Sequence, residues 1–174
     1  MNDAAQSPIY IANAGLVLVH PFLPQLFSRL GLFSTGEAGG RRQLGEHGAR
    51  AVQLLQYLAD GRTDAPESEL ALNKLLCGLS PDFPASPIEL SYEEMAVCDQ
   101  LLLGVIDNWT AVRNTSRENL RESFLQRNGY LRWQDGRCTL TVSRKPLDVL
   151  LDRIEWSWST IMHPWMPQAL YVTW

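Results

Sequence analysis

The chain has 174 residues, of which 45% are hydrophobic and 20% charged, and its formal net charge at pH 7 is −4. These values are typical of a soluble globular protein and exclude a largely disordered chain. The length is that of one domain, large enough to bury a core without disulfide bonds. We therefore predict a single domain over residues 8–174 and a disordered N-terminus over residues 1–7.

The charges are unevenly distributed along the chain. Residues 60–107 contain ten acidic and two basic residues, whereas residues 109–153 contain nine basic and five acidic residues. Either the two segments attract each other within one fold, or they form a dipolar surface that docks onto charged partners. The basic residues are dispersed along predicted helices and strands, so nucleic acid is not an expected partner.

The three cysteines are Cys77, Cys98 and Cys138, and no two of them have the spacing of a metal-binding or redox pair. Each lies on a predicted apolar face, so we expect buried free thiols in a reducing compartment. No signal peptide is recognisable, and the apolar run 16–19 is too short to span a membrane.

The N-terminal segment combines a short extended piece with a helix. Residues 9–11 predict a strand, but the apolar run after Gly15 fits a buried strand or a buried helix equally well. Pro21 suits the first turn of a helix that Gly31 ends. The glycine-rich residues 34–45 predict a flexible loop, and they match neither of the common phosphate-binding motifs.

Three further helices are predicted where apolar residues recur at helical spacing. The first covers residues 49–59. The second follows Asp64 and Glu67, and the third follows Ser91 and Glu94; both pairs have the spacing of a capping box. The third helix is the longest, and its apolar stripe fits a buried core better than a coiled-coil seam, because no heptads extend it.

Two more helices are predicted on either side of a hairpin. Thr115 and Glu118 have capping-box spacing at the start of the first of these helices, and Asn128 with Gly129 ends it. Residues 143–154 predict the second helix. Both helices are expected to supply part of the core that the hairpin covers.

The hairpin between these helices has a strong local signal. Asp135 and Gly136 lie between two alternating runs, as in a two-residue hairpin turn. Counting outward from the turn predicts an apolar face and a solvated face. The apolar face contains Leu131, Trp133, Cys138, Leu140 and Val142, and the solvated face contains Tyr130, Arg132, Arg137, Thr139 and Thr141.

The C-terminal residues are rich in tryptophan. Residues 156–162 alternate in the manner of a strand, and residues 170–174 resume the pattern after a break. Such a tail either closes the core as additional strands or forms a docking patch. The candidate partner-binding residues are Trp156, Trp158, Trp165, Tyr171 and Trp174.

The predicted fold class is α+β. It is mostly helical, with about five or six helices, and it has a small antiparallel sheet built from the C-terminal hairpin and terminal strands. His20, His47 and His163 lie in unrelated contexts, and no Ser, Cys or carboxylate has a catalytic motif around it. We therefore predict no catalytic, cofactor or metal site. An enzyme whose site converges from distant residues remains an alternative.

Several segments of the chain together resemble the conserved region of tape measure proteins of contractile injection systems, the phage-tail-like particles of bacteria. The resemblance extends over residues 8–174. The segments that carry it are residues 11–18, 20–24, 26–27, 50–58, 69–78, 114–116, 120–127, 148–153 and 164–166.

The resemblance implies a structural, non-enzymatic part in assembly that helps set the length of the tube and sheath. It implies baseplate hub, spike and inner tube proteins as partners. It also implies a cytoplasmic location during assembly, followed by incorporation into the particle. A fully helical chain of this length would reach only about 260 Å, and the sequence predicts a compact body instead. The chain is therefore expected to be the folded terminal part of a tape measure protein, or alternatively a stand-alone adaptor or chaperone-like domain.

Overall fold

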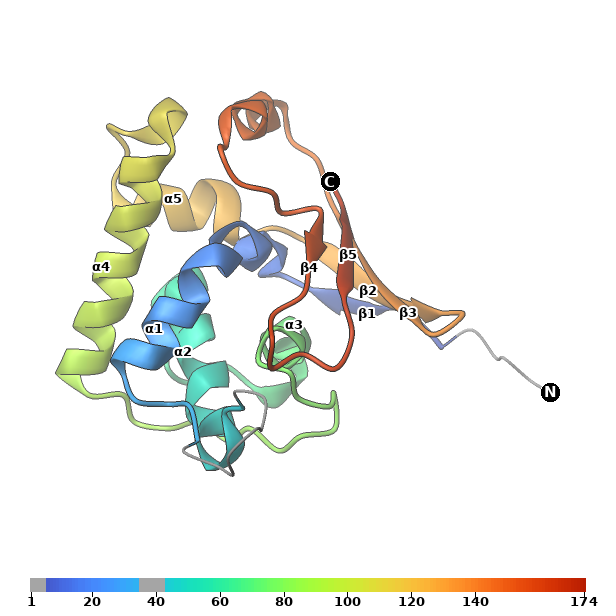
Figure 1. The fold of residues 1–174 in the computed structure, drawn as a ribbon. Coiled ribbons are helices and arrows are strands. Elements are labelled where there is room, and N and C mark those ends of the chain that lie inside the picture. The colour runs from blue at the N-terminus through green and yellow to red at the C-terminus, as the bar shows by residue number, and fades with distance from the viewer. Residues whose placement is uncertain (1–5, 35–42) are drawn as a thin grey trace.

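The computed structural model describes residues 6–34 and 43–174 (Figure 1). Helices pack against one face of a five-stranded sheet whose strand order is β1-β2-β3-β5-β4. Most of the predicted disordered N-terminus 1–7 and of the predicted loop 34–45 lies outside the described residues. The strands are β1 (Ile9–Ile11), β2 (Gly129–Gln134), β3 (Arg137–Val142), β4 (Thr160–Ile161) and β5 (Leu170–Thr173).

The helical elements account for most of the described secondary structure, which confirms the mostly helical α+β prediction. The α-helices are α1 (Leu23–Arg29), α2 (Gly48–Asp60), α3 (Ala71–Leu76), α4 (Tyr92–Asn108) and α5 (Arg117–Leu120). A π-helical turn, η5 (Arg121–Leu125), continues α5. The 3₁₀ elements are η1 (Ala14–Phe22), η2 (Gly45–His47), η3 (Glu67–Glu69), η4 (Thr110–Val112) and η6 (Pro146–Arg153).

The sheet is mixed, so the prediction of an antiparallel sheet is wrong for one strand pair. β3 and β5 are parallel, with Leu140 opposite Val172, whereas the other three pairs are antiparallel. Between β3 and β5 the chain passes through η6 and the edge strand β4, and β5 then runs in the same direction as β3. Parallel neighbours need such a long crossover. The strand predicted at residues 9–11 is β1, which pairs with β2 at the edge of the sheet.

The predicted hairpin register is confirmed. Trp133 lies opposite Cys138 and Leu131 opposite Leu140. Asp135 and Gly136 have φ values of 51° and 73°, as a type I′ turn requires. The face toward the helices is buried except at Trp133, which is half-buried near the hairpin tip.

Local helix signals were correct at some starts and wrong at others. Ser91 and Glu94 form the predicted capping box of α4, and Gly61 ends α2 in the left-handed conformation. Asp64 and Glu67 form no cap, because a 3₁₀ turn precedes α3 there. At α5 the cap is Ser116 rather than Thr115, and its hydroxyl accepts from the Asn119 backbone N–H.

The apolar run after Gly15 forms the 3₁₀ element η1, which resolves the strand-or-helix ambiguity. Residues 14–19 are all buried, so no polar face marks a period in the sequence. Gly15 packs directly on the backbone of η5: a Cβ placed there would lie 1.7 Å from the Phe124 carbonyl oxygen. Only glycine permits this approach.

Substitutions at two adjacent hairpin residues test the register. Leu131 is 0% exposed, so Leu131→Ala should lower the free energy of unfolding by about 2–5 kcal/mol. Arg132 points to solvent, so Arg132→Ala should cost less than about 1 kcal/mol. Urea denaturation of both variants measures the difference, and equal costs would contradict this register.

Candidate protein-interaction surface

Three of the segments that carry the family resemblance meet in a buried cluster of amides. The Asn13 side-chain N–H₂ donates to Gln56 Oε1 at 3.0 Å and to Asn73 Oδ1 at 2.7 Å. Asn73 in turn donates to the backbone carbonyl of Val52 at 3.0 Å. Buried amides are costly unless they are paired in this way. The cluster therefore fixes η1, α2 and α3 relative to one another.

The segment around η5 caps the C-terminal end of α2. Arg121 donates from Nε to the Leu58 carbonyl at 3.2 Å and from Nη2 to the Tyr57 carbonyl at 3.1 Å. Gln126 donates to the Ala59 carbonyl at 3.2 Å. The last backbone carbonyls of a helix have no hydrogen-bond partner within it, and a positive charge near that end stabilises the helix. These two side chains thus explain part of the segment 120–127.

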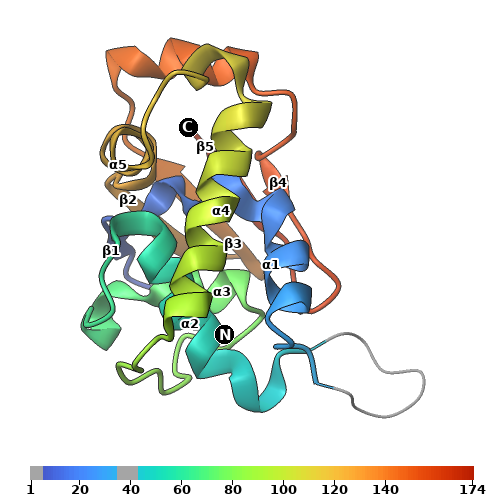
Figure 2. The ribbon, with the colours of Figure 1, turned by 90° about the vertical axis from the view of Figure 1, so that its left-hand side faces the viewer.

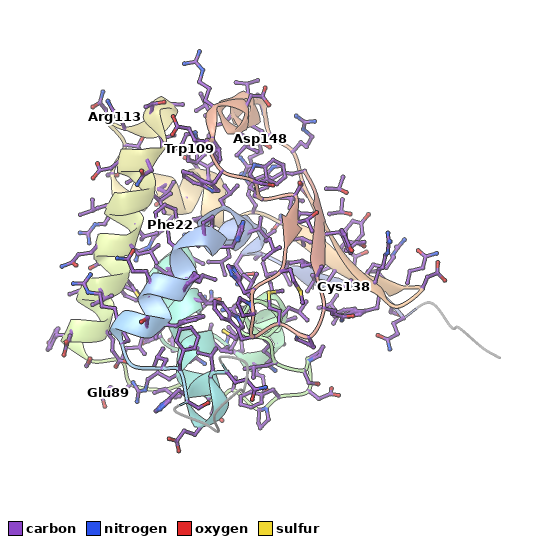
Figure 3. The ribbon with its side chains drawn as sticks, in the orientation of Figure 1. Phe22, Glu89, Trp109, Arg113, Cys138 and Asp148 are labelled. Carbon is purple, nitrogen blue, oxygen red and sulfur yellow. The ribbon has the colours of Figure 1, made fainter. Side chains whose placement is uncertain are left out.

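Arg127 and Asp148 form a fully buried ion pair that closes the C-terminal part of the fold. Arg127 is 0% and Asp148 2% exposed, and both guanidinium Nη atoms donate to the carboxylate. The indole N–H of Trp174 and the backbone N–H of Lys145 donate to the same carboxylate at 2.9 and 2.8 Å. Burial opposes ionisation of Asp148, but these hydrogen bonds hold the pKa of its carboxyl below the usual value. Figure 3 labels Asp148 at η6, at one end of the molecule.

A pair of histidines joins η1 to the C-terminal tail. His20 Nε2 donates to the Ser157 carbonyl at 2.7 Å, so its Nδ1 is the acceptor for His163 Nε2 at 3.3 Å. The His163 ring stacks on Trp165 with centroids 4.5 Å apart. A second proton between the two rings would place two donors against each other. This arrangement requires a neutral His20.

We expect stability to fall as the pH drops from 7 to 5. Burial lowers the pKa of His20, and burial together with His20 lowers the pKa of His163 to about 4. The unfolded chain binds protons near the ordinary value of 6.5 while the folded chain does not, so the free energy of unfolding decreases as the pH falls through this window. Because both rings are partly screened by solvent, the loss should be about 1–2 kcal/mol.

Denaturation with urea at pH 7, 6 and 5 measures this dependence. The His163→Gln variant removes one titrating ring and keeps a donor, so its stability should change less over the same range. An equal slope for the variant and the unmodified chain would show that the histidine pair does not cause the dependence.

The structure places three of the five candidate residues apart from one another. Trp165 is buried, and its indole N–H donates to the Leu76 carbonyl at 2.8 Å. Trp156 is half-buried against Phe22, and its indole N–H donates to the Leu18 carbonyl at 2.8 Å. Tyr171 lies on the opposite face of the sheet, under Arg137. Trp165 and Trp156 thus fasten the tail to the helices.

The other two candidates, Trp158 and Trp174, do meet. Their rings contact edge to face with centroids 5.7 Å apart, and both are half-buried. Trp174 also bonds Asp148, and the neighbours of Asp148 on η6, Leu147 and Val149, are 40% and 68% exposed. Here we call Leu147, Val149, Trp158 and Trp174 the η6–tail surface. Its two aliphatic members were not among the predicted site residues.

The profile of a family described as contractile injection system tape measure protein matches residues 1–174, the whole chain. The chain belongs to this family. No curated protein and no solved structure matches it. The predicted resemblance is therefore confirmed.

The polar residues of this tape measure family member are largely engaged in such contacts. The three cysteines are buried and free, and burial raises the pKa values of Cys98 and Cys138 to about 12. A groove of about 570 Å³ beside β1 is lined partly by Asn13, Gln56 and Asp60, which bond within the amide cluster. In the described part of the chain, no group of three or more His, Cys, Asp or Glu could hold a metal ion.

None of the described helices combines the length and the apolar character that crossing a membrane requires.

Proposed function

We propose that this chain is the folded terminal part of a tape measure protein and that it seats the ruler at one end of the tube. Family membership supports a place in a contractile injection system. The observation that carries the proposal is the set of buried polar contacts, in which the amide cluster and the Arg127–Asp148 pair hold distant segments together.

A length ruler must be extended, and these residues are not. The longest helix, α4, has 17 residues and thus spans about 26 Å. A single chain of this size has a radius of gyration of about 16 Å. A body of these proportions fits an end of the particle better than a position along a tube. We therefore assign this folded body a role at the start of assembly. The lengths of the tube and sheath are set by an extended segment instead.

The η6–tail surface is the proposed site of docking onto baseplate hub, spike or inner tube proteins. Exposed apolar side chains and tryptophans are the residues that dominate protein interfaces. Asp148 is buried between Leu147 and Val149 and is held by Arg127, so the two aliphatic side chains project from a fixed base. Rigid presentation lowers the entropic cost of binding.

Charged substitutions on this surface test the proposal. Leu147→Glu combined with Val149→Glu should reduce co-purification with the hub, spike and tube proteins at least about tenfold, because two carboxylates would have to be desolvated. The matched control is Leu103→Glu combined with Met162→Glu, whose targets are exposed at 48% and 53% and lie outside the η6–tail surface. Circular dichroism confirms that both variants fold. Equal co-purification of the two variants would contradict docking through the η6–tail surface.

A further inference from the structure

The outer face of the sheet is uncovered and positively charged. In Figure 1 the helices lie on the other side of the sheet, and no described helix covers this face. The strands contain two arginines and no Asp or Glu. Cross-strand pairing places ten side chains on the face, and none of them is buried: Tyr10, Tyr130, Arg132, Gln134, Arg137, Thr139, Thr141, Thr160, Tyr171 and Thr173.

The aromatic and basic side chains of this face contact one another. Tyr10 and Tyr130 are neighbours with ring centroids 6.0 Å apart. The Arg132 guanidinium lies 5.5 Å from the Tyr130 ring, and the Arg137 guanidinium lies 5.1 Å from the Tyr171 ring. These contacts hold the two guanidinium groups against the sheet, where each is exposed and makes no ion pair with a described residue. Such a surface favours a partner that offers carboxylates and flat apolar groups.

The opposite side of the molecule offers those groups. Residues 75–112 contain six acidic residues and no lysine or arginine. Arg50 binds Glu94 and Arg117 binds Asp99, whereas Glu89 and Glu93 are exposed and form no ion pair with a described residue. Beside them Tyr92 is 90% exposed.

The two surfaces face away from each other. Figure 2 shows α4 in front and the sheet behind it, and Figure 3 places Glu89 and Cys138, which marks β3, on opposite sides of the molecule. They therefore cannot pair within one chain. We propose that the sheet face binds the acidic start of α4, around Glu89, Tyr92 and Glu93, on a second copy of this chain.

Such an interface is head-to-tail, because two different surfaces of the same chain meet. Each stack keeps one free sheet face at one end and one free α4 start at the other, so further copies can add until a different component caps the stack. The two arginines have two unpaired carboxylates to meet, and Tyr92 can pack among the tyrosines and threonines of the sheet. This inference uses surfaces other than the η6–tail surface and does not depend on the proposed docking there.

The test is the mass of the purified chain in solution, measured by sedimentation at increasing concentration. At low salt the mass should rise with concentration, and high salt should reduce it, because salt screens exposed charge pairs. Variant S carries Arg132→Glu and Arg137→Glu, and variant H carries Glu89→Lys and Glu93→Lys. Each should raise the dissociation constant at least about tenfold, since like charges then face each other.

An equimolar mixture of S and H distinguishes this geometry from others. The sheet face of H and the α4 start of S are both unaltered, so the mixture should form complexes although neither variant does alone. The matched control, Arg144→Glu with Arg153→Glu, changes two exposed arginines outside the sheet face and should associate like the unmodified chain. A monomer at every concentration, normal association of S, or a mixture that stays monomeric would each overturn the proposal.

Discussion

Replacing Arg127 by methionine should lower the free energy of unfolding by about 3–5 kcal/mol, because the Asp148 carboxylate would remain buried without its counter-ion. Arg127 is 0% exposed, and it also donates to the carbonyls of Ser123 and Ser143 at 3.0 and 3.3 Å. Its guanidinium lies 5.5 Å from the Trp174 ring. The substitution therefore loosens both η6 and the C-terminus, and guanidinium chloride denaturation measures the loss.

A double substitution separates the ion pair from simple packing. Arg127→Met combined with Asp148→Leu removes both charges, so its cost should be smaller than the sum of the two single costs. If the cost of the double substitution equalled the sum of the two single costs, the two side chains would not be coupled. A cost at Arg127→Met of less than about 1 kcal/mol, as at an exposed arginine, would contradict the buried pair itself.

Replacing Gly15 by alanine should prevent folding or cost at least about 3 kcal/mol, since the new methyl group would overlap a fixed backbone. The nearest atoms, the Phe124 carbonyl and the Leu125 Cα, lie 1.7 and 2.6 Å from the position of that methyl. Neither can move without separating η1 from η5. Thermal unfolding followed by circular dichroism is sufficient to detect a loss of this size.

Gly104 provides the matched control. It lies in α4, and the nearest atom to an added Cβ is Phe22 Cε1 at 3.9 Å, an ordinary contact. Gly104→Ala should therefore stabilise the chain by about 0.5–1 kcal/mol through helix propensity. If both substitutions had the same effect, the close packing of η1 on η5 would be contradicted.

Local signals in the sequence predicted the turns and caps that form between residues close together in the sequence. The hairpin follows from Asp135 and Gly136, and the start of α4 follows from Ser91 and Glu94. In each case the atoms that form the turn or cap are within a few residues of one another. The error at Thr115 is also local, because the hydroxyl of the adjacent Ser116 accepts the same type of capping hydrogen bond.

Long-range contacts decided the features that the sequence did not predict. The parallel pairing of β3 with β5 depends on where the tail returns after η6, and no local residue specifies it. The alternating run 156–162 forms a strand only at Thr160–Ile161, because Trp156 is instead held by a carbonyl of η1. No motif in the sequence around Arg127 or Asp148 indicates that these two side chains pair.

The candidate site also depends on long-range contacts that the sequence did not reveal. Composition drew attention to the tail, but it could not distinguish Trp165, which is buried, from Trp158, which is half-buried. Leu147 and Val149 were not selected, since apolar residues in a predicted helix are ordinarily assigned to its buried face. Their exposure follows from Asp148, whose side chain turns inward to meet Arg127.

The most direct test of the proposed function is the length distribution of particles assembled without residues 8–174, measured by electron microscopy. A folded domain that seats the ruler is required before tube growth starts, so its removal should abolish assembly or leave tubes of scattered length. Shortening an extended ruler segment should instead give particles that are uniform and shorter. Particles of normal, uniform length that still contract after removal of residues 8–174 would contradict the account.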